Sequence, residues 1–176
     1  MSDDRERGLL LVHTGNGKGK SSAAFGMLAR ALGHGLSAVV VQFVKSRSDT
    51  GEALFFRAVP GVRWHVMGAG FTWETQDRAV DTAAAEAAWG MAKASLADPT
   101  VDLLILDEMT YAFTECWLDL DEVLAALRAR PPMQHVVITG RGAPRALVEA
   151  ADTVTEMALV KHAFASGVKA MKGVEW

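Results

Sequence analysis

Short runs of apolar residues alternate along the chain with longer segments in which apolar residues recur every three or four positions. A continuous apolar run is typical of a β-strand buried on both faces, and the three-to-four spacing is typical of an α-helix with one buried face. The apolar runs predict strands over residues 9–13, 37–44, 62–67, 102–106, 135–139 and 153–157. The periodic segments predict helices over residues 20–32, 78–96, 120–127 and 144–150.

Glycine and proline mark the ends of these helices, because glycine adopts the left-handed backbone of a helix end at little cost and proline cannot continue a helix. Gly33 and Gly35 follow the first helix, Asp98-Pro99 the second and Pro131-Pro132 the third. Pro144 stands at the favoured start of the last helix. The spacing places Phe25, Leu28, Ala29 and Leu32 on one face of the first helix, and Val80, Ala84, Ala87 and Met91 on one face of the second.

The order of these elements predicts the fold class. Strands that alternate with helices favour a three-layer α/β fold, in which helices cover both faces of a mostly parallel sheet of about six strands. The chain of 176 residues is long enough to bury a full core, and it shows no internal repeat, linker or low-complexity segment. We therefore expect one domain over residues 1–176. Residues 158–176 show no clear period.

Composition narrows the class of protein. Half of the residues are hydrophobic and the formal net charge is -3, so neither disorder nor binding to nucleic acid through bulk charge is expected. Cys116 is the single cysteine, which excludes a disulfide framework within the chain and fits a reducing compartment. The charged start, MSDDRERG, lacks the apolar segment of a signal peptide. These features predict a soluble, cytoplasmic protein.

The stretch between the first predicted strand and the first predicted helix, HTGNGKGKSS, has the character of a phosphate-binding loop. The common pattern is G-x-x-x-x-G-K-[ST], and Thr14 stands where its first glycine would be. Glycines let the backbone approach phosphate oxygens, the lysine neutralises them, a hydroxyl binds Mg²⁺, and the helix start adds a positive dipole end. The alternative is a plain glycine turn. The nucleotide-binding candidates are Thr14, Gly15, Asn16, Gly17, Lys18, Gly19, Lys20, Ser21 and Ser22, with Lys20 also catalytic and Ser21 a metal ligand.

A second candidate element is LLILDE, which ends a buried strand with Asp107 and Glu108. Ligands of parallel sheets bind at the carboxyl ends of the strands, and a carboxylate there can hold Mg²⁺ directly or through water. Both residues are therefore metal-ligand candidates, and Glu108 is also a catalytic candidate. The alternative for Asp107 is to cap a following helix.

Other polar residues stand near predicted strand ends. Gln42 and Lys45 end the second strand, and Glu52 follows Gly51 at a helix start, where the alternative is a capping charge. Arg141 follows the fifth strand, where a guanidinium can pair with phosphate. A structural pairing of Arg141 with Asp152 or Glu156 is the alternative.

Two aromatic residues, Phe71 and Trp73, lie in the glycine-flanked stretch GAGFTWE after the third strand. Aromatic residues on such a loop are poor core candidates, although the loop can also fold back onto the core. The histidines show no metal-ligand spacing, so no zinc site is predicted. Composition alone does not separate a hydrolase, a kinase and a transferase, because all three can use the loop and the acidic pair.

The sequence resembles the ATP:corrinoid adenosyltransferases of cobalamin biosynthesis and salvage from Gly8 to Trp176. That family also has Thr-Gly-Asn-Gly-Lys-Gly-Lys in its loop, so Thr14 fits the family. The resemblance rests on ordered blocks: TGNGKGKSSAAFG (14–26), VVQFVK (40–45), TGE (50–52), GFTWETQD (70–77), LDEMTYA (106–112), ITGRGAP (138–144), ADTVTEM (151–157) and KHAFASGVKA (161–170).

The resemblance implies a P-loop NTPase-like (RecA-like) fold and a reaction. The Co(I) centre of a reduced corrinoid (cobyrinic acid a,c-diamide, cobinamide or cobalamin) attacks the 5′ carbon of ATP, and the whole triphosphate leaves. Mg²⁺, or Mn²⁺ in its place, stabilises the leaving group together with Lys20 and the loop. Phe71 and Trp73 would lie against the lower face of the corrinoid. The C-terminal residues would lie near the nucleotide. A flavoprotein reductase and a homodimer are implied partners.

The sequence also departs from the family pattern. Few residues precede Gly8, so a segment that closes over the partner's corrinoid in relatives is expected to be reduced. The peripheral departures are Ser46, Ser48, Ala69, Ala158 and Met171. Two other functions remain as alternatives: a P-loop ATPase or small-molecule kinase, and a carrier that binds nucleotide or corrinoid without turnover.

Overall fold

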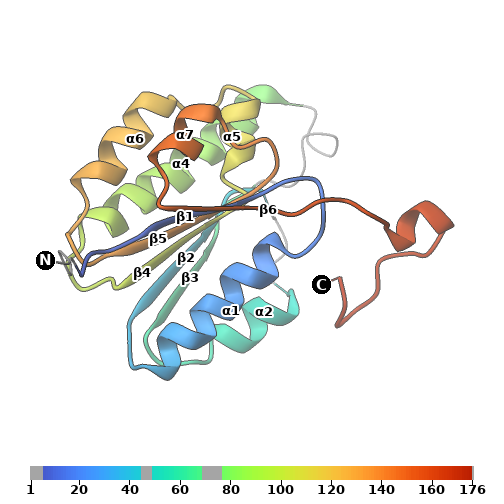
Figure 1. Cartoon of the computed structure of the whole chain (residues 1–176), viewed down its shortest axis with the longest axis horizontal. Coiled ribbons are helices and arrows are strands. Elements are labelled where there is room, and N and C mark those ends of the chain that lie inside the picture. Colours follow the sequence, from blue (N-terminus) through green and yellow to red (C-terminus); the bar gives the residue numbers. More distant parts are fainter. Residues whose placement is uncertain (1–5, 45–48, 69–76, 176) are drawn as a thin grey trace, which may run out of the picture.

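A parallel sheet forms the centre of the computed structural model, which describes residues 6–44, 49–68 and 77–175 (Figure 1). The sheet has six strands in the order β3-β2-β4-β5-β1-β6, and every neighbouring pair is parallel. The three-layer α/β class with a six-stranded sheet is therefore confirmed. The strands are β1 (Leu10–Thr14), β2 (Ala38–Gln42), β3 (Val62–Val66), β4 (Leu103–Asp107), β5 (His135–Thr139) and β6 (Thr153–Glu156).

Helices cover both faces of the sheet (Figure 1). One face carries α1 (Lys20–Gly33) and α2 (Gly51–Phe56). The other carries α4 (Arg78–Ala97), α5 (Thr110–Thr114), α6 (Leu120–Ala129) and α7 (Arg145–Ala150). A short 3-10 helix, η1 (Ala163–Ser166), lies in the C-terminal segment. Within the described ranges, no helix is both long and apolar enough to cross a membrane.

The buried residues form two apolar clusters, one on each face of the sheet. In β4, Leu104 and Leu106 face the cluster under α4, α6 and α7, whereas Leu103 and Ile105 face the cluster under α1 and α2. Successive strand side chains point to opposite faces, so a strand between two helical layers must be apolar at every position. Each fully buried aliphatic side chain stabilises the fold by about 1.5–3 kcal/mol.

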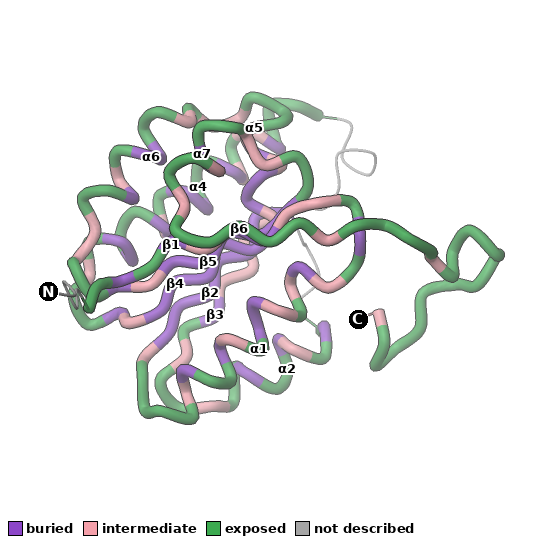
Figure 2. The backbone as a smooth tube through the Cα atoms, in the orientation of Figure 1, coloured by how far each residue is buried: buried purple, intermediate pink, exposed green. Residues whose placement is uncertain are grey.

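The edge of the sheet and the C-terminal segment are more exposed than the centre (Figure 2). All four residues of β6 are exposed, since this strand pairs only with β1. After β6, the C-terminal segment (residues 157–175) runs away from the sheet and returns toward α1 (Figure 1). Large apolar side chains of this segment are exposed, namely Leu159, Val160, Phe164, Val168, Met171 and Val174.

The face of α4 that the spacing marks is not the face that the helix buries. Val80 and Ala87 are exposed, and the helix instead buries Ala85, Ala88, Trp89, Ala92 and Leu96. Alanine is so frequent in this helix that it fits more than one face, and the large side chains of Trp89 and Leu96 determine the orientation. In α1, Phe25 and Leu28 are buried as predicted, but Ala29 is exposed because Ala24 and Ala31 occupy the contact with the sheet.

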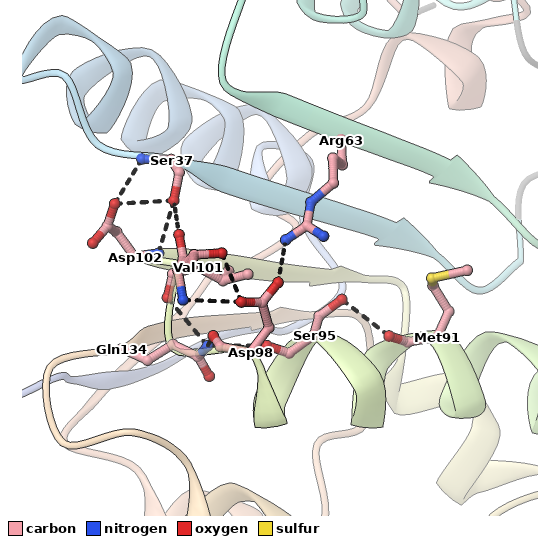
Figure 3. A network of polar contacts seen from close by, with 9 residues as sticks. Ser37, Arg63, Met91, Ser95, Asp98, Val101, Asp102 and Gln134 are labelled. Carbon is pink, nitrogen blue, oxygen red and sulfur yellow. Dashed lines mark hydrogen bonds and ion pairs between the residues drawn. The ribbon is translucent and has the colours of Figure 1, made fainter.

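The amino ends of the strands are joined by a polar network (Figure 3). Gln134, just before β5, donates from Nε2 to the carbonyl oxygens of Ser95 and Val101 at 3.0 and 3.1 Å. Asp102, just before β4, accepts from the amide of Ser37 at 2.7 Å. Asp98, after α4, accepts from Arg63 at 2.9 Å. These side chains use most of their polar groups within the network, although the buried Oε1 atom of Gln134 has no hydrogen-bond partner among the described residues. The candidate ligand-binding residues lie at the opposite, carboxyl edge of the sheet.

Candidate active site

The glycine-rich loop joins β1 to α1 at the carboxyl edge of the sheet (Figure 1). Gly15 and Gly19 have φ of 91° and 110°, a left-handed backbone that other residues adopt only with strain. Gly19 is also the residue from which α1 begins. The loop therefore turns the chain from strand to helix and presents the start of α1, as the sequence predicts for a phosphate-binding loop.

The loop rests against the residues that follow β6. The amide of Gly17 donates to the carbonyl of Met157 at 2.7 Å, and the amide of Met157 donates to the carbonyl of Thr14 at 2.9 Å. A Cβ atom on Gly15 would lie 2.5 Å from the carbonyl oxygen of Met157, and one on Gly17 would lie 2.5 Å from that of Ala158. These two glycines are thus required by backbone packing as well as by access for a ligand.

The end of the C-terminal segment also reaches the loop, because Lys18 forms an ion pair with Glu175. The expectation that this segment packs near the nucleotide loop is confirmed. Ala158 packs on Gly17 through its carbonyl group, so its identity as alanine does not disturb that contact. Met171 is exposed.

Lys20 is buried at the start of α1, and its Nζ donates to the carbonyl of Gly17 at 2.6 Å. Burial lowers the pKa of the Lys20 ammonium below its ordinary value; the charge of Glu108 opposes this, whereas Arg141 and Lys18 lower it further. The same electrostatic neighbourhood includes Asp107. The structure thus gathers the loop lysines, the acidic pair and Arg141, which come from three separate parts of the sequence.

Asp107 ends β4 and is completely buried. Its Oδ2 accepts from Gln42 Nε2 at 2.9 Å, and its Oδ1 accepts from Thr139 Oγ1 at 2.8 Å. Helix α5 begins after Met109 without a side-chain cap, so the capping alternative for Asp107 is wrong. Glu108 has a φ of 59°, and this left-handed turn directs the chain out of the sheet at the site.

Arg141 follows β5 on a loop whose backbone is held by neighbouring elements. Thr110 Oγ1 donates to the carbonyl of Arg141 at 2.6 Å. Arg141 does not pair with Asp152, which instead accepts from Arg7 at 2.9 Å and from the amide of Leu10 at 2.8 Å. The exposed guanidinium of Arg141 is therefore near the phosphate loop without that partner.

Comparison with known proteins identifies the family of the chain. Residues 6–176 match the family model described as ATP:corrinoid adenosyltransferase BtuR/CobO/CobP. The chain belongs to the ATP:corrinoid adenosyltransferase family. It is 64% identical over 172 residues to a corrinoid adenosyltransferase of Pseudomonas aeruginosa, which covers 97% of this chain and 85% of that protein. It is 52% identical over 171 residues to the corrinoid adenosyltransferase CobA of Salmonella typhimurium, with 97% and 87% covered.

In this adenosyltransferase, sequence reasoning missed two residues that support the acidic pair. Thr139 donates to Asp107, and its Oγ1 also accepts from the amide of Glu108 at 3.0 Å. Trp64 Nε1 donates to Gln42 Oε1 at 3.1 Å. Both polar ends of the Gln42 side chain are therefore engaged inside the protein, and Gln42 lies beneath the site. The only signal in the sequence is that Thr139 ends an apolar strand run.

The remaining described candidates lie at helix starts. Ser21 is half-buried in the first turn of α1, and Ser22 is exposed beside it. Glu52 is in the first turn of α2, a helix that the Thr50 hydroxyl caps by accepting from the amide of Ala53 at 3.4 Å. That position agrees with the alternative of a favourable charge at a helix start.

Several candidates of the adenosyltransferase lie outside the described residues. They are Lys45, Phe71 and Trp73, together with the departures from the family pattern at Ser46, Ser48 and Ala69.

Proposed function

We propose that this adenosyltransferase transfers the 5′-deoxyadenosyl group of ATP to the Co(I) centre of a corrinoid and releases the triphosphate intact. The observation that carries the proposal is the concentration of positive groups around the phosphate loop: Lys18 and Arg141 both lie close enough to Lys20 to act on its charge. A departing triphosphate carries several negative charges, and preorganised cations and loop amides stabilise such charge.

The bonds and electrons of the step balance without a nucleophile from the protein. Co(I) supplies the electron pair that forms the Co–C bond to the 5′ carbon, and cobalt becomes formally Co(III). The bond from the 5′ carbon to the α-phosphate oxygen breaks, and its electron pair leaves with the triphosphate. The protein's tasks are to align the two substrates and to hold the leaving group. Lys20, fixed at the loop by Gly17, performs the second task.

The residues present fit a divalent cation such as Mg²⁺. Ser21, Asp107 and Glu108 offer hydroxyl and carboxylate oxygens, the ligands that Mg²⁺ prefers when it also binds substrate phosphates. We propose that these residues hold Mg²⁺, with Mn²⁺ as a substitute. The ion would neutralise part of the charge on the triphosphate. Asp107 is already bonded through both oxygens to Gln42 and Thr139, so it is fixed before any ion binds.

For the corrinoid, we propose that Phe71 and Trp73 lie against the lower face of the ring and that Lys45 contributes near the nucleotide. The support is the family membership, since these residues fall in blocks shared with the family. We also propose that Glu52 and Arg141 contribute to substrate binding. Cobyrinic acid a,c-diamide, cobinamide and cobalamin are the substrates to compare, and their relative rates would assign the enzyme to biosynthesis or salvage.

The reaction also suggests partners and a location. Co(I) requires an electron donor, so we propose a flavoprotein reductase as a partner. We propose a homodimer because the C-terminal segment exposes Val160, Phe164 and Val174, and exposed apolar groups are typical of interfaces. We propose that residues 1–176 act as one domain in the cytoplasm, where ATP is available.

The deciding experiment incubates the protein with ATP, Mg²⁺ and a chemically reduced corrinoid. The expected result is a Co–C adenosyl bond, seen in the absorption spectrum, with intact triphosphate in equal amount. Lys20→Ala should abolish product, whereas Lys93→Ala, on an exposed position of α4, should retain it. Release of ADP and phosphate alone would overturn the proposal in favour of an ATPase or kinase, and tight binding without turnover would favour a carrier.

A further inference from the structure

The loop that carries Arg141 (residues 140–144) is tied to the end of β1 and to the start of α5, the helix that follows β4. The amide of Gly140 donates to the carbonyl of His13 at 3.1 Å, at the end of β1. The amide of Ala143 donates to Thr14 Oγ1 at 3.2 Å. From the other side, Thr110 Oγ1 donates to the carbonyl of Arg141 at 2.6 Å, just after the acidic pair.

Thr14 makes a side-chain hydrogen bond that a glycine at its position could not make. Its carbonyl accepts from Met157 as part of the sheet edge, while its hydroxyl accepts from the Arg141 loop. A glycine has no side-chain acceptor, so the amide of Ala143 would lose this partner. Thr14 therefore joins the phosphate loop directly to the loop of Arg141.

Thr110 makes the equivalent connection from the acidic side. It is completely buried, and Gly140 leaves the space that it fills: a Cβ atom on Gly140 would lie 2.1 Å from Thr110 Oγ1. Gly140 has a φ of 140° and Gly142 a φ of 63°, so the loop follows a path that glycine favours on both sides of Arg141. Close packing and the hydrogen bond fix the backbone of Arg141 relative to the acidic pair.

We propose that Thr14 and Thr110 are positioning residues that hold Arg141 at the phosphate loop, ready to bind the triphosphate. This inference rests on the proposed function. A cation whose backbone is fixed in advance loses less freedom when it binds its ligand than one on a free loop, so binding is tighter. Arg141 is suited to this role because its guanidinium is close enough to influence Lys20 and its planar fork matches phosphate oxygens.

The experiment is a double-mutant cycle on the full chain, with inorganic triphosphate as the probe in titration calorimetry at fixed salt and Mg²⁺. Arg141→Ala should weaken binding. Thr110→Val should weaken it roughly fivefold, the factor expected for one net hydrogen bond. In the Arg141→Ala background, Thr110→Val should have no further effect, because its action passes through Arg141.

Two kinds of variant separate positioning from stability. Thr110→Ser retains the hydroxyl and should bind as the wild type does. Thr114→Val is the matched control, since Thr114 lies on the same helix and donates to the carbonyl of Thr110 at 3.3 Å; it should leave binding unchanged. If Thr110→Val does not fold, the same cycle is made with Thr14→Val in place of Thr110→Val and with Thr14→Ser as its conservative variant, because Thr14 is only half-buried.

The outcomes for the two proposals differ. An equal loss from Thr110→Val with and without Arg141 would overturn the inference, and so would unchanged binding in Arg141→Ala. In both cases the wild type would still form the Co–C bond and release triphosphate. Failure of the wild type to do so would overturn the proposed function instead.

Discussion

Thr139 provides the sharpest test of how the acidic pair is held. Its side chain is completely buried, and its hydroxyl makes two hydrogen bonds, one to the Asp107 carboxylate and one from the amide of Glu108. Thr139→Val keeps almost the same shape and removes both. It leaves a buried carboxylate with one donor fewer and a backbone N–H group without this acceptor.

The magnitude follows from these two bonds. A hydrogen bond to a charged group contributes about 1.5–3 kcal/mol, and an unsatisfied buried group costs about 1–3 kcal/mol. Because the two overlap in part, Thr139→Val should lower the free energy of unfolding by about 3 kcal/mol. For a chain of this size, that loss corresponds to a fall of roughly 6–12 °C in the melting temperature.

Urea unfolding followed by circular dichroism and by tryptophan fluorescence measures this loss, and agreement of the two signals checks that unfolding is two-state. Thr139→Ser keeps the hydroxyl and should lose about 1 kcal/mol, the effect of one methyl group. Thr155→Val makes the same change on the exposed strand β6 and should have little effect. A loss below about 1 kcal/mol for Thr139→Val would refute the reasoning, because it would mean that these bonds contribute less than one ordinary hydrogen bond.

Three other predictions concern charge and backbone packing. Hydrogen bonds from the hydroxyl and amide of Thr100 lower the pKa of Asp98 to about 2 from 3.8. The stability that the Asp98 carboxylate provides is therefore complete above pH 3.8 and is lost as the pH falls to about 2. Asp98→Asn should be less stable than the wild type at pH 7, and the difference between their urea midpoints should close over that acidic range. Gly17→Ala places a Cβ atom 2.5 Å from a carbonyl oxygen and should weaken triphosphate binding in calorimetry, whereas Gly26→Ala, with open space around it, should leave binding intact and add up to about 1 kcal/mol to stability. Burial lowers the pKa of Lys20, so the charge of Lys20 opposes folding at neutral pH. Lys20→Met should therefore melt no lower than the ligand-free wild type, but it should lose the rise in melting temperature that triphosphate gives. In the wild type, that rise should shrink as increasing pH passes the lowered pKa of Lys20.

The sheet could be predicted from sequence because its strands are buried on both faces and therefore read as apolar runs. His135–Thr139 has the same bounds in the sequence prediction and in the structure, and the other strands differ at their ends by one or two residues. The loop glycines and Lys20 were found because a phosphate loop requires those residue types at that spacing. Helix α5 was missed because five residues are too few to show a helical period.

What the sequence did not contain was the pairing of side chains from distant strands. Trp64, Gln42, Asp107 and Thr139 come from four strands, and their hydrogen bonds form only because the sheet order places those strands side by side. The link between Thr14 and Ala143 depends on β1 lying next to β5. Spacing along the chain carries no information about such contacts.

The strand order also determines when the site can form during synthesis. Strand β1 is made first, but its neighbours in the sheet, β5 and β6, are made last; Leu9 and its hydrogen-bond partner His135 are 126 positions apart. Strands β2, β3 and β4 neighbour one another and emerge early enough to pair before the chain is complete. The phosphate loop can take its final conformation only after Met157 has been made, because the carbonyl of Met157 accepts from the amide of Gly17. A nascent chain held on the ribosome before that residue is therefore expected to have a partly formed sheet and no ability to bind the nucleotide.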